Sequence, residues 1–100
     1  MLDLSQTIGF DWDEANSGKS ASKHSLSRAE AEQIFFDEQL LLADDVKHSQ
    51  DEPRYHALGQ TIEGRLLHVT FTLRDNQTRI RVISARDANR RERAAYAQKA

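Results

Sequence analysis

The chain has 100 residues, 38% of them hydrophobic and 30% charged, with a formal net charge of -2, so we expect one domain, 1–100, with a thin core. It has no cysteine, which excludes disulfides, thiolate catalysis and cysteine-ligated zinc. No apolar run is as long as a signal-peptide core or a membrane-spanning helix, so we expect a cytoplasmic protein without a membrane partner.

The first half of the chain predicts one strand and two helices. Apolar residues alternate with small or acidic ones in "IGFDWD", which is typical of a half-buried strand near 7–12. The following stretch, "DEANSGKSASKHS", has few apolar residues, so a helix there would depend on tertiary contacts. Ser27 and Glu30 have the spacing of a capping box, which predicts a second helix running to about Asp37.

The second half predicts strands in meander order and a last helix. The short apolar run "LLLADD" favours a strand, although a continued helix would have the same periodicity. "RYHALGQT" and "RLLHVTFTL" predict two strands of a hairpin, and the second should be central in the sheet. After the turn "RDNQT", "RIRVIS" alternates again, with Ile80 and Val82 inward. From about Asp87 the sequence is typical of a helix with a narrow apolar stripe.

This order of elements predicts the fold class. One strand, two helices, three or four strands and a last helix are typical of an α+β domain. Strands joined by hairpins are antiparallel neighbours. We therefore expect an antiparallel sheet of about four strands with helices packed mainly on one side.

Arginine is concentrated in the last third of the chain. Residues 65–100 hold nine Lys or Arg against three acids, whereas the preceding residues carry a net charge of -8. Guanidinium groups are planar and match phosphate oxygens. Arg79 and Arg81 share a strand face and Arg65 lies on the adjacent strand, so we expect a guanidinium cluster that binds a phosphate backbone. For any single arginine, an ordinary exposed ion pair remains the simpler explanation.

Four histidines supply side chains that titrate near neutrality. His24 and His48 lie in polar, loop-like segments and are candidates for acid–base chemistry, whereas His56 and His68 fall within predicted strands. RNA cleavage without metal needs a base for the ribose 2′-hydroxyl, cations for the phosphorane and an acid for the leaving oxygen. Histidines and arginines can meet that requirement.

Other residues give weaker indications. Glu52 beside Arg54 is a candidate base and phosphate clamp, with a surface ion pair as the alternative. Trp12 and Tyr96 could stack on bases, although we expect Trp12 in the core. No histidine pair has zinc-site spacing and no glycine pattern forms a phosphate loop, so we expect neither a metal nor a nucleotide cofactor.

Five segments together resemble the BrnT family, the toxin half of a bacterial type II toxin–antitoxin pair. They are "FDWDEA", "KHSLS", "HSQDEPRYHALG", "GRLLHVTFT" and "RIRVISARDANRRERAAY", and they span 10–96. The resemblance implies a fold related to RelE-type ribonucleases and RNA cleavage that blocks translation. It also implies a BrnA-type antitoxin with a ribbon-helix-helix domain, so operator DNA would be bound only through the complex.

The charge pattern and the resemblance together nominate site residues. Candidate catalytic residues are His24, His48, Glu52, Arg54, Arg65 and Arg86, and candidate RNA-binding residues are Lys23, Arg79, Arg81, Arg90, Arg93 and Tyr96. Three positions depart from the family pattern, which usually has lysine, asparagine and glycine where this chain has Asn16, Ser20 and Ser25. These departures bear on any role assigned to the first helix region.

We therefore expect a metal-independent endoribonuclease toxin. The alternative is a catalytically weakened or inactive homologue that binds the antitoxin and acts as a co-repressor. A DNA-binding regulator acting alone is a third reading, but no helix-turn-helix or basic-zipper pattern accompanies the basic terminal helix. We also expect the antitoxin to cover the basic surface and so exclude RNA.

Overall fold

The computed structural model describes residues 4–12, 27–48 and 52–99. Its strands and α-helices are β1 (Gly9–Asp11), α2 (Arg28–Gln33), β2 (Leu41–Asp44), β3 (Tyr55–Gln60), β4 (Leu66–Arg74), β5 (Arg79–Asp87) and α3 (Arg90–Lys99). Two short 3-10 helices are η1 (Ile34–Phe36) and η2 (Val46–His48). The predicted strands are thus present, and the helix expected within 13–26 lies outside the described residues.

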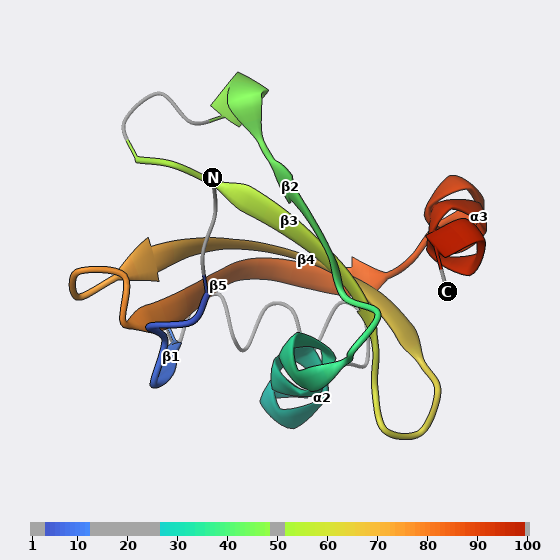
Figure 1. Cartoon of the computed structure of the whole chain (residues 1–100), viewed down its shortest axis with the longest axis horizontal. Coiled ribbons are helices and arrows are strands. Elements are labelled where there is room, and N and C mark those ends of the chain that lie inside the picture. The colour runs from blue at the N-terminus through green and yellow to red at the C-terminus, as the bar shows by residue number, and fades with distance from the viewer. Residues whose placement is uncertain (1–3, 13–26, 49–51, 100) are drawn as a thin grey trace.

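The strands form one five-stranded sheet in the order β1-β5-β4-β3-β2 (Figure 1). Strands β2 to β5 are antiparallel neighbours, whereas β1 pairs with β5 in parallel. The α+β class and the central place of β4 are confirmed. The prediction of about four antiparallel strands is wrong, because β1 adds a parallel edge strand. Its partner lies far along the sequence, and local alternation does not reveal such a pairing.

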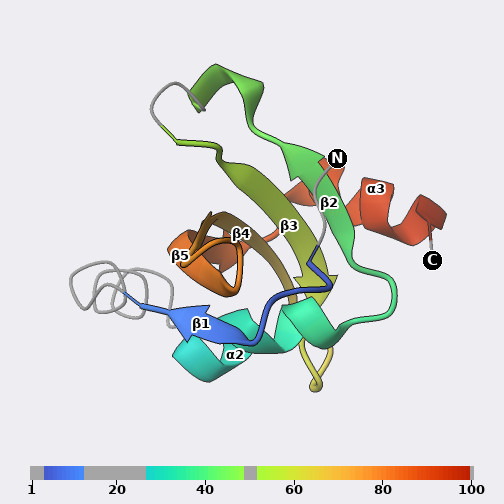
Figure 2. The same ribbon diagram turned by 60° about the vertical axis from the view of Figure 1, so that its left-hand side comes forward.

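The helices lie at different places on the sheet (Figures 1 and 2). Residues of α2 and η1 cover one face, where they enclose the main core with Leu67, Val69 and Phe71. Tyr96 of α3 instead packs against a second, smaller cluster that includes Leu58. The expectation that helices pack mainly on one side is therefore wrong for α3, because Leu58 alternates with the core residues and points away from α2.

Local chemistry explains where α2 and η1 form. Ser27 and Glu30 make both hydrogen bonds of the predicted capping box, and each bond between side chain and backbone is 3.1 Å long. The helix continues into η1, where Ile34 is fully buried against β3. Gly59 of β3 permits this approach, because a Cβ there would lie 2.9 Å from both the Cβ and the carbonyl oxygen of Ile34.

Strand β5 contains a β-bulge opposite the middle of β4. The register shifts between Thr70 and Phe71, whose partners are Ser84 and Val82, so Ile83 is left without a partner. A bulge adds one residue to one strand only. Because side chains alternate along a strand, this single residue exchanges the two faces of β5 beyond it.

The bulge decides which side chains of β5 are buried. Before it, Ile80 and Val82 face the core, and after it Ala85 does. Arg86 consequently shares the outward face with Arg81, although uninterrupted alternation would turn Arg86 inward. The alternation in "RIRVIS" therefore holds only as far as the bulge.

The last helix begins later than predicted because an asparagine caps it. The strand continues to Asp87, and the helix begins at Arg90 instead of near Asp87. Asn89 Oδ1 accepts a hydrogen bond from the Glu92 backbone at 2.8 Å, and Glu92 Oε1 accepts one from the Asn89 backbone at 2.9 Å. This reciprocal pair is a capping box with asparagine in place of serine.

Candidate functional site

The side of the sheet turned away from α2 carries polar residues from three strands. We call it the polar face and define it by His56 of β3, His68 and Thr70 of β4, and Ser84 and Arg86 of β5. The register pairs His56 with Thr70, His68 with Arg86, and Thr70 with Ser84. Directly paired residues point to the same side of a sheet, so these five side chains form one surface.

The two histidines of the polar face lie against each other. Their ring centroids are 4.8 Å apart and their planes meet at 39°. His56 Nδ1 is 3.1 Å from Thr70 Oγ1, and His56 Nε2 is 3.2 Å from a carboxylate oxygen of Asp45. At the other end, His68 Nε2 lies 3.7 Å from Glu92 Oε2. A carboxylate therefore flanks the histidine pair on each side.

The surroundings of His68 favour its neutral form. Burial lowers the pKa of His68 and outweighs the opposing attraction of the Glu92 carboxylate. The positive charges of Arg86 and of protonated His56 lower it further. Because the ordinary pKa of histidine is already about 6.5, His68 is uncharged at neutral pH.

Arg86 is held by Glu92 in a two-pronged ion pair. Its Nη1 and Nη2 donate to the two carboxylate oxygens at 2.8 and 2.9 Å, and Nη1 also donates to the Asp87 carbonyl at 3.1 Å. A guanidinium has five N–H donors in total. Within the described residues, the Nε donor and one Nη2 donor of Arg86 thus have no acceptor, so they can bind a further group.

Acid titration of Glu92 is expected to weaken the attachment of α3. The hydrogen bonds from Arg86, against the effect of burial, lower the Glu92 pKa to about 2 from an ordinary 4.5. A carboxylate with a depressed pKa stabilises the fold above its unfolded pKa, and this contribution is lost as the pH falls through the folded value. The stability advantage of the wild type over Glu92→Gln should therefore shrink between about pH 4.5 and pH 2, as measured by urea unfolding. An advantage that stays constant over this range would contradict the expectation.

Arg65 does not join the predicted guanidinium cluster. Its side chain lies on the α2 side of the sheet, where Nη1 is 3.1 Å from Glu30 of α2 and Nε is 2.6 Å from Asp87. The prediction that Arg65 lies with Arg79 and Arg81 is wrong. Arg65 directly precedes β4 and is in phase with its core residues Leu67 and Val69, so it points to the α2 side, away from Arg79 and Arg81, and joins α2 to the end of β5.

Arg79 and Arg81 share the outward side of β5, as predicted, but each lies near an acid. Arg79 Nε is 3.2 Å from Asp75, and Arg81 Nη1 is 3.9 Å from Asp11 of the neighbouring β1. Exposed pairs of this kind contribute little to stability. They do lower the net positive charge that this end of the sheet offers to a phosphate.

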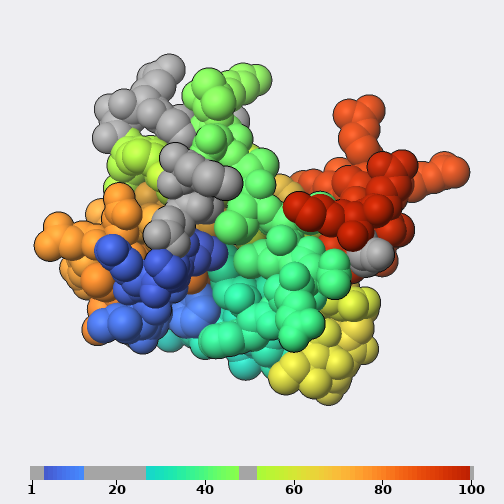
Figure 3. Space-filling view, in the orientation of Figure 1, coloured from blue at the N-terminus to red at the C-terminus, as the bar shows by residue number. Residues whose placement is uncertain are grey.

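The arginines of α3 differ from those of the strands. Arg90, Arg91 and Arg93 are exposed, and long side chains at the start of α3 project away from the body of the protein (Figure 3). No ion pair joins them to an acid within the part of the chain that the structure describes. Their charges are therefore more accessible to an anionic partner than those of the strand arginines.

The predicted pair of Glu52 and Arg54 lies at the start of β3. Glu52 contacts Arg74 of β4 at 3.1 Å. Arg54 is half-buried, and its carbonyl accepts a hydrogen bond from the Asp45 backbone at 2.9 Å. Both residues thus border the loop that supplies Asp45 to the histidine pair.

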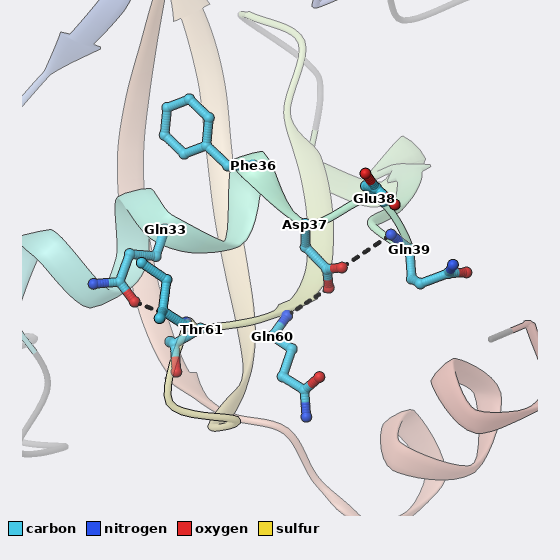
Figure 4. A pocket seen from close by; sticks show the side chains of 8 residues that line it. Gln33, Phe36, Asp37, Glu38, Gln39, Gln60 and Thr61 are labelled. Carbon is cyan, nitrogen blue, oxygen red and sulfur yellow. Dashed lines mark hydrogen bonds between the residues drawn. The ribbon is translucent and has the colours of Figure 1, made fainter.

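Tyr96 fixes α3 to the turn after η1. Its hydroxyl donates to Asp37 Oδ2 at 2.5 Å, and the backbone amides of Gln39 and Gln60 donate to the same carboxylate at 2.9 and 2.8 Å (Figure 4 shows the last two bonds). Burial opposes ionisation of Asp37, but these bonds together lower its pKa. Burial and the Asp37 bond raise the pKa of Tyr96 to about 12. Tyr96 therefore has a packing role, whatever part its ring plays in stacking.

The histidines that the sequence favoured are not the ones that the structure brings together. Lys23, His24 and the side chain of His48 lie outside the described residues. His56 and His68 are the weaker candidates by sequence, because they fall within predicted strands. They occupy outward positions on the two strands of one hairpin, and that pattern could have identified them as neighbours.

The described ranges contain neither a metal-binding cluster nor a membrane-spanning helix. No group of three or more His, Asp or Glu side chains in these ranges could hold a metal ion. None of the helices found there is long and apolar enough to cross a membrane.

The sequence of this chain matches the model of a known protein family. Residues 12–92 match the model described as "Ribonuclease toxin, BrnT, of type II toxin-antitoxin system". The match covers most of the chain, so the chain belongs to the BrnT family, and the resemblance predicted from the sequence is confirmed. Membership in this class of ribonuclease toxins implies an RNA substrate and a protein antitoxin.

A solved structure has the same fold. The crystal structure of the Brucella abortus ribonuclease toxin, BrnT, matches with a TM-score of 0.63 and 23% sequence identity. The alignment covers 84% of this chain and 100% of the Brucella chain. No curated protein sequence matches.

Proposed function

We propose that this chain is an endoribonuclease toxin that cleaves RNA by acid–base chemistry without a metal ion and thereby inhibits translation. The observation that carries the proposal is the polar face, where Arg86 stands beside a pair of histidine side chains. Family membership supplies the reaction class. We also propose that the fold is related to that of RelE-type ribonucleases.

The roles of individual residues follow from their positions. Arg86 binds the scissile phosphate, and the exposed arginines of α3 hold the neighbouring backbone. Arg79 and Arg81 extend this binding surface along β5, and Tyr96 lies at its border. Arg65 acts on the other face, by holding α2 against the end of β5. The remaining candidates for catalytic or RNA-binding roles are Lys23, His24, His48, Glu52 and Arg54.

The antitoxin in this proposal is a BrnA-type protein with a ribbon-helix-helix domain. Arg90, Arg91 and Arg93 offer exposed positive charge beside the polar face. An acidic segment of the antitoxin laid over α3 would therefore neutralise these charges and exclude RNA in one step. Operator DNA is bound through the antitoxin in such a complex.

The proposed cleavage is tested with purified protein and total RNA in the presence of excess EDTA. We expect cleavage to continue in EDTA and to give ends with 2′,3′-cyclic phosphate, because the 2′-hydroxyl is the nucleophile. Adding the antitoxin encoded beside the gene should stop it. Cleavage that requires an added divalent ion would contradict the metal-free mechanism, and intact RNA would contradict the activity itself.

One observation favours the alternative of an inactive homologue that acts as co-repressor. The four arginines of strands β4 and β5 each contact an acid, which weakens the phosphate-binding potential of the sheet; they are Arg74, Arg79, Arg81 and Arg86. The RNA assay separates the two functions, because a co-repressor would leave RNA intact. Expression without antitoxin would then give folded protein and normal growth.

A further inference from the structure

The polar face contains a histidine whose place in the hairpin suits proton transfer. We propose that His68 is the general base that removes the ribose 2′-hydroxyl proton during RNA cleavage, while the adjacent Arg86 binds the phosphate. This inference rests on the proposed function and adds the identity of the base. The sequence had placed that role on other residues.

The relative placement of His68 and Arg86 suits these two roles. His68 and Arg86 are direct partners across β4 and β5, so their Cβ atoms are about 5 Å apart. In RNA the attacking 2′-hydroxyl is on the ribose that carries the scissile phosphate. A base and a phosphate-binding cation must therefore stand side by side, as these two do. The His68 side chain keeps 15% of its surface exposed, on the side of the sheet that Arg86 also faces.

The charges around His68 also suit a general base, which must be unprotonated before it reacts. The half-buried ring of His68 faces His56 on β3 and Arg86 on β5, and both disfavour a proton on it. Glu92 of α3 lies 3.7 Å from Nε2 and would stabilise the imidazolium once it forms. The Asp45 carboxylate is at the far side of His56. The ring is thus neutral at rest and has a carboxylate ready for its charged form.

The other acids near the polar face are engaged elsewhere. Glu92 accepts two hydrogen bonds from Arg86, and Asp45 contacts His56. Each carboxylate also lies in contact with a cation or a potential cation, which makes it a weak base. His56 is a positioning residue here, since Thr70 and Asp45 hold its ring while its face packs on His68.

The step balances without a co-reactant. The 2′-hydroxyl proton passes to His68 as the bond between O2′ and phosphorus forms. The bond between phosphorus and O5′ breaks, and the leaving O5′ takes a proton from water. His68 then returns its proton to the solvent, which leaves a 2′,3′-cyclic phosphate and a free 5′-hydroxyl.

The test is the pH profile of RNA cleavage in EDTA by the wild type, His68→Gln and His56→Gln. In the wild type we expect kcat/KM to fall on the acidic side, below about pH 6.5, as His68 becomes protonated. His68→Gln should lose about 100-fold or more in kcat/KM and should lose this acidic limb. His56→Gln should lose less and keep the limb, because its amide can still contact Thr70 and Asp45.

The remaining outcomes show whether the role of His68 or the proposed function itself is wrong. If His68→Gln cleaves like the wild type or keeps the acidic limb, another group is the base and the inference is wrong while the proposed function stands. If the wild type does not cleave RNA, both are wrong. An NMR titration of the His68 ring in the wild type gives a second measurement that needs no variant. A ring pKa that differs from the midpoint of the acidic limb would overturn the inference even if His68→Gln did not fold.

Discussion

Replacing Arg86 by alanine is expected to lower RNA cleavage by about 100-fold, because removing one donor to a developing oxyanion typically costs that much. The same change should abolish growth arrest when the protein is expressed without antitoxin. The physical reason is the loss of a cation whose free donors lie beside His68. Cleavage of a defined RNA by the purified variant measures the effect.

The control for Arg86→Ala must separate lost phosphate binding from loosening of α3. Arg28→Ala removes an equal charge from the other side of the sheet and should cleave RNA normally. Tyr96→Phe removes a different tether of α3, the bond to Asp37, but keeps the ring. It should also stay active. If Tyr96→Phe loses as much activity as Arg86→Ala, attachment of α3 and not phosphate binding explains both.

Replacing Phe71 by alanine is expected to cost about 3–5 kcal/mol in the free energy of unfolding. Phe71 lies in the middle of the central strand and is fully buried. Its ring meets Phe35 edge-on with centroids 5.2 Å apart and lies 5.5 Å from Tyr55. A domain of this size has a total stability of roughly 5–15 kcal/mol, so the variant would be close to unfolding.

Urea unfolding measures the loss, and Ile62→Ala is the matched control. Ile62 is 87% exposed, so its truncation should change the unfolding free energy by less than about 0.5 kcal/mol. A loss below about 1 kcal/mol for Phe71→Ala would show that the main core is not centred on β4.

Local patterns predicted most of the fold because local chemistry determines those elements. The capping box at Ser27 predicted α2, and alternation predicted the buried face of β4. The predictions that failed concern features that depend on contacts between residues distant in sequence. The parallel pairing of Gly9–Asp11 with β5 and the place of α3 beyond the second cluster arise only once the sheet has formed.

The site was less predictable than the fold. Arg86 was nominated and lies on the polar face, but the proposed cluster with Arg65 failed, because strand parity turns Arg65 to the side of α2. Arginine counts also do not reveal partners, and Asp75 and Asp11 offset charges that the composition treats as free. The histidine pair becomes visible only when His56 and His68 are placed in register across the hairpin.

The unpaired Ile83 has a consequence for how this chain tolerates change. Removing that one residue would leave Val82 opposite Phe71 and Ser84 opposite Thr70, so plain alternation would still place Ala85 inside and Arg86 outside. Straightening the strand with Ile83 retained would instead drive Arg86 into the apolar interior and display Ala85 to solvent. The bulge, and not the number of residues in β5, is therefore what keeps Arg86 beside His68.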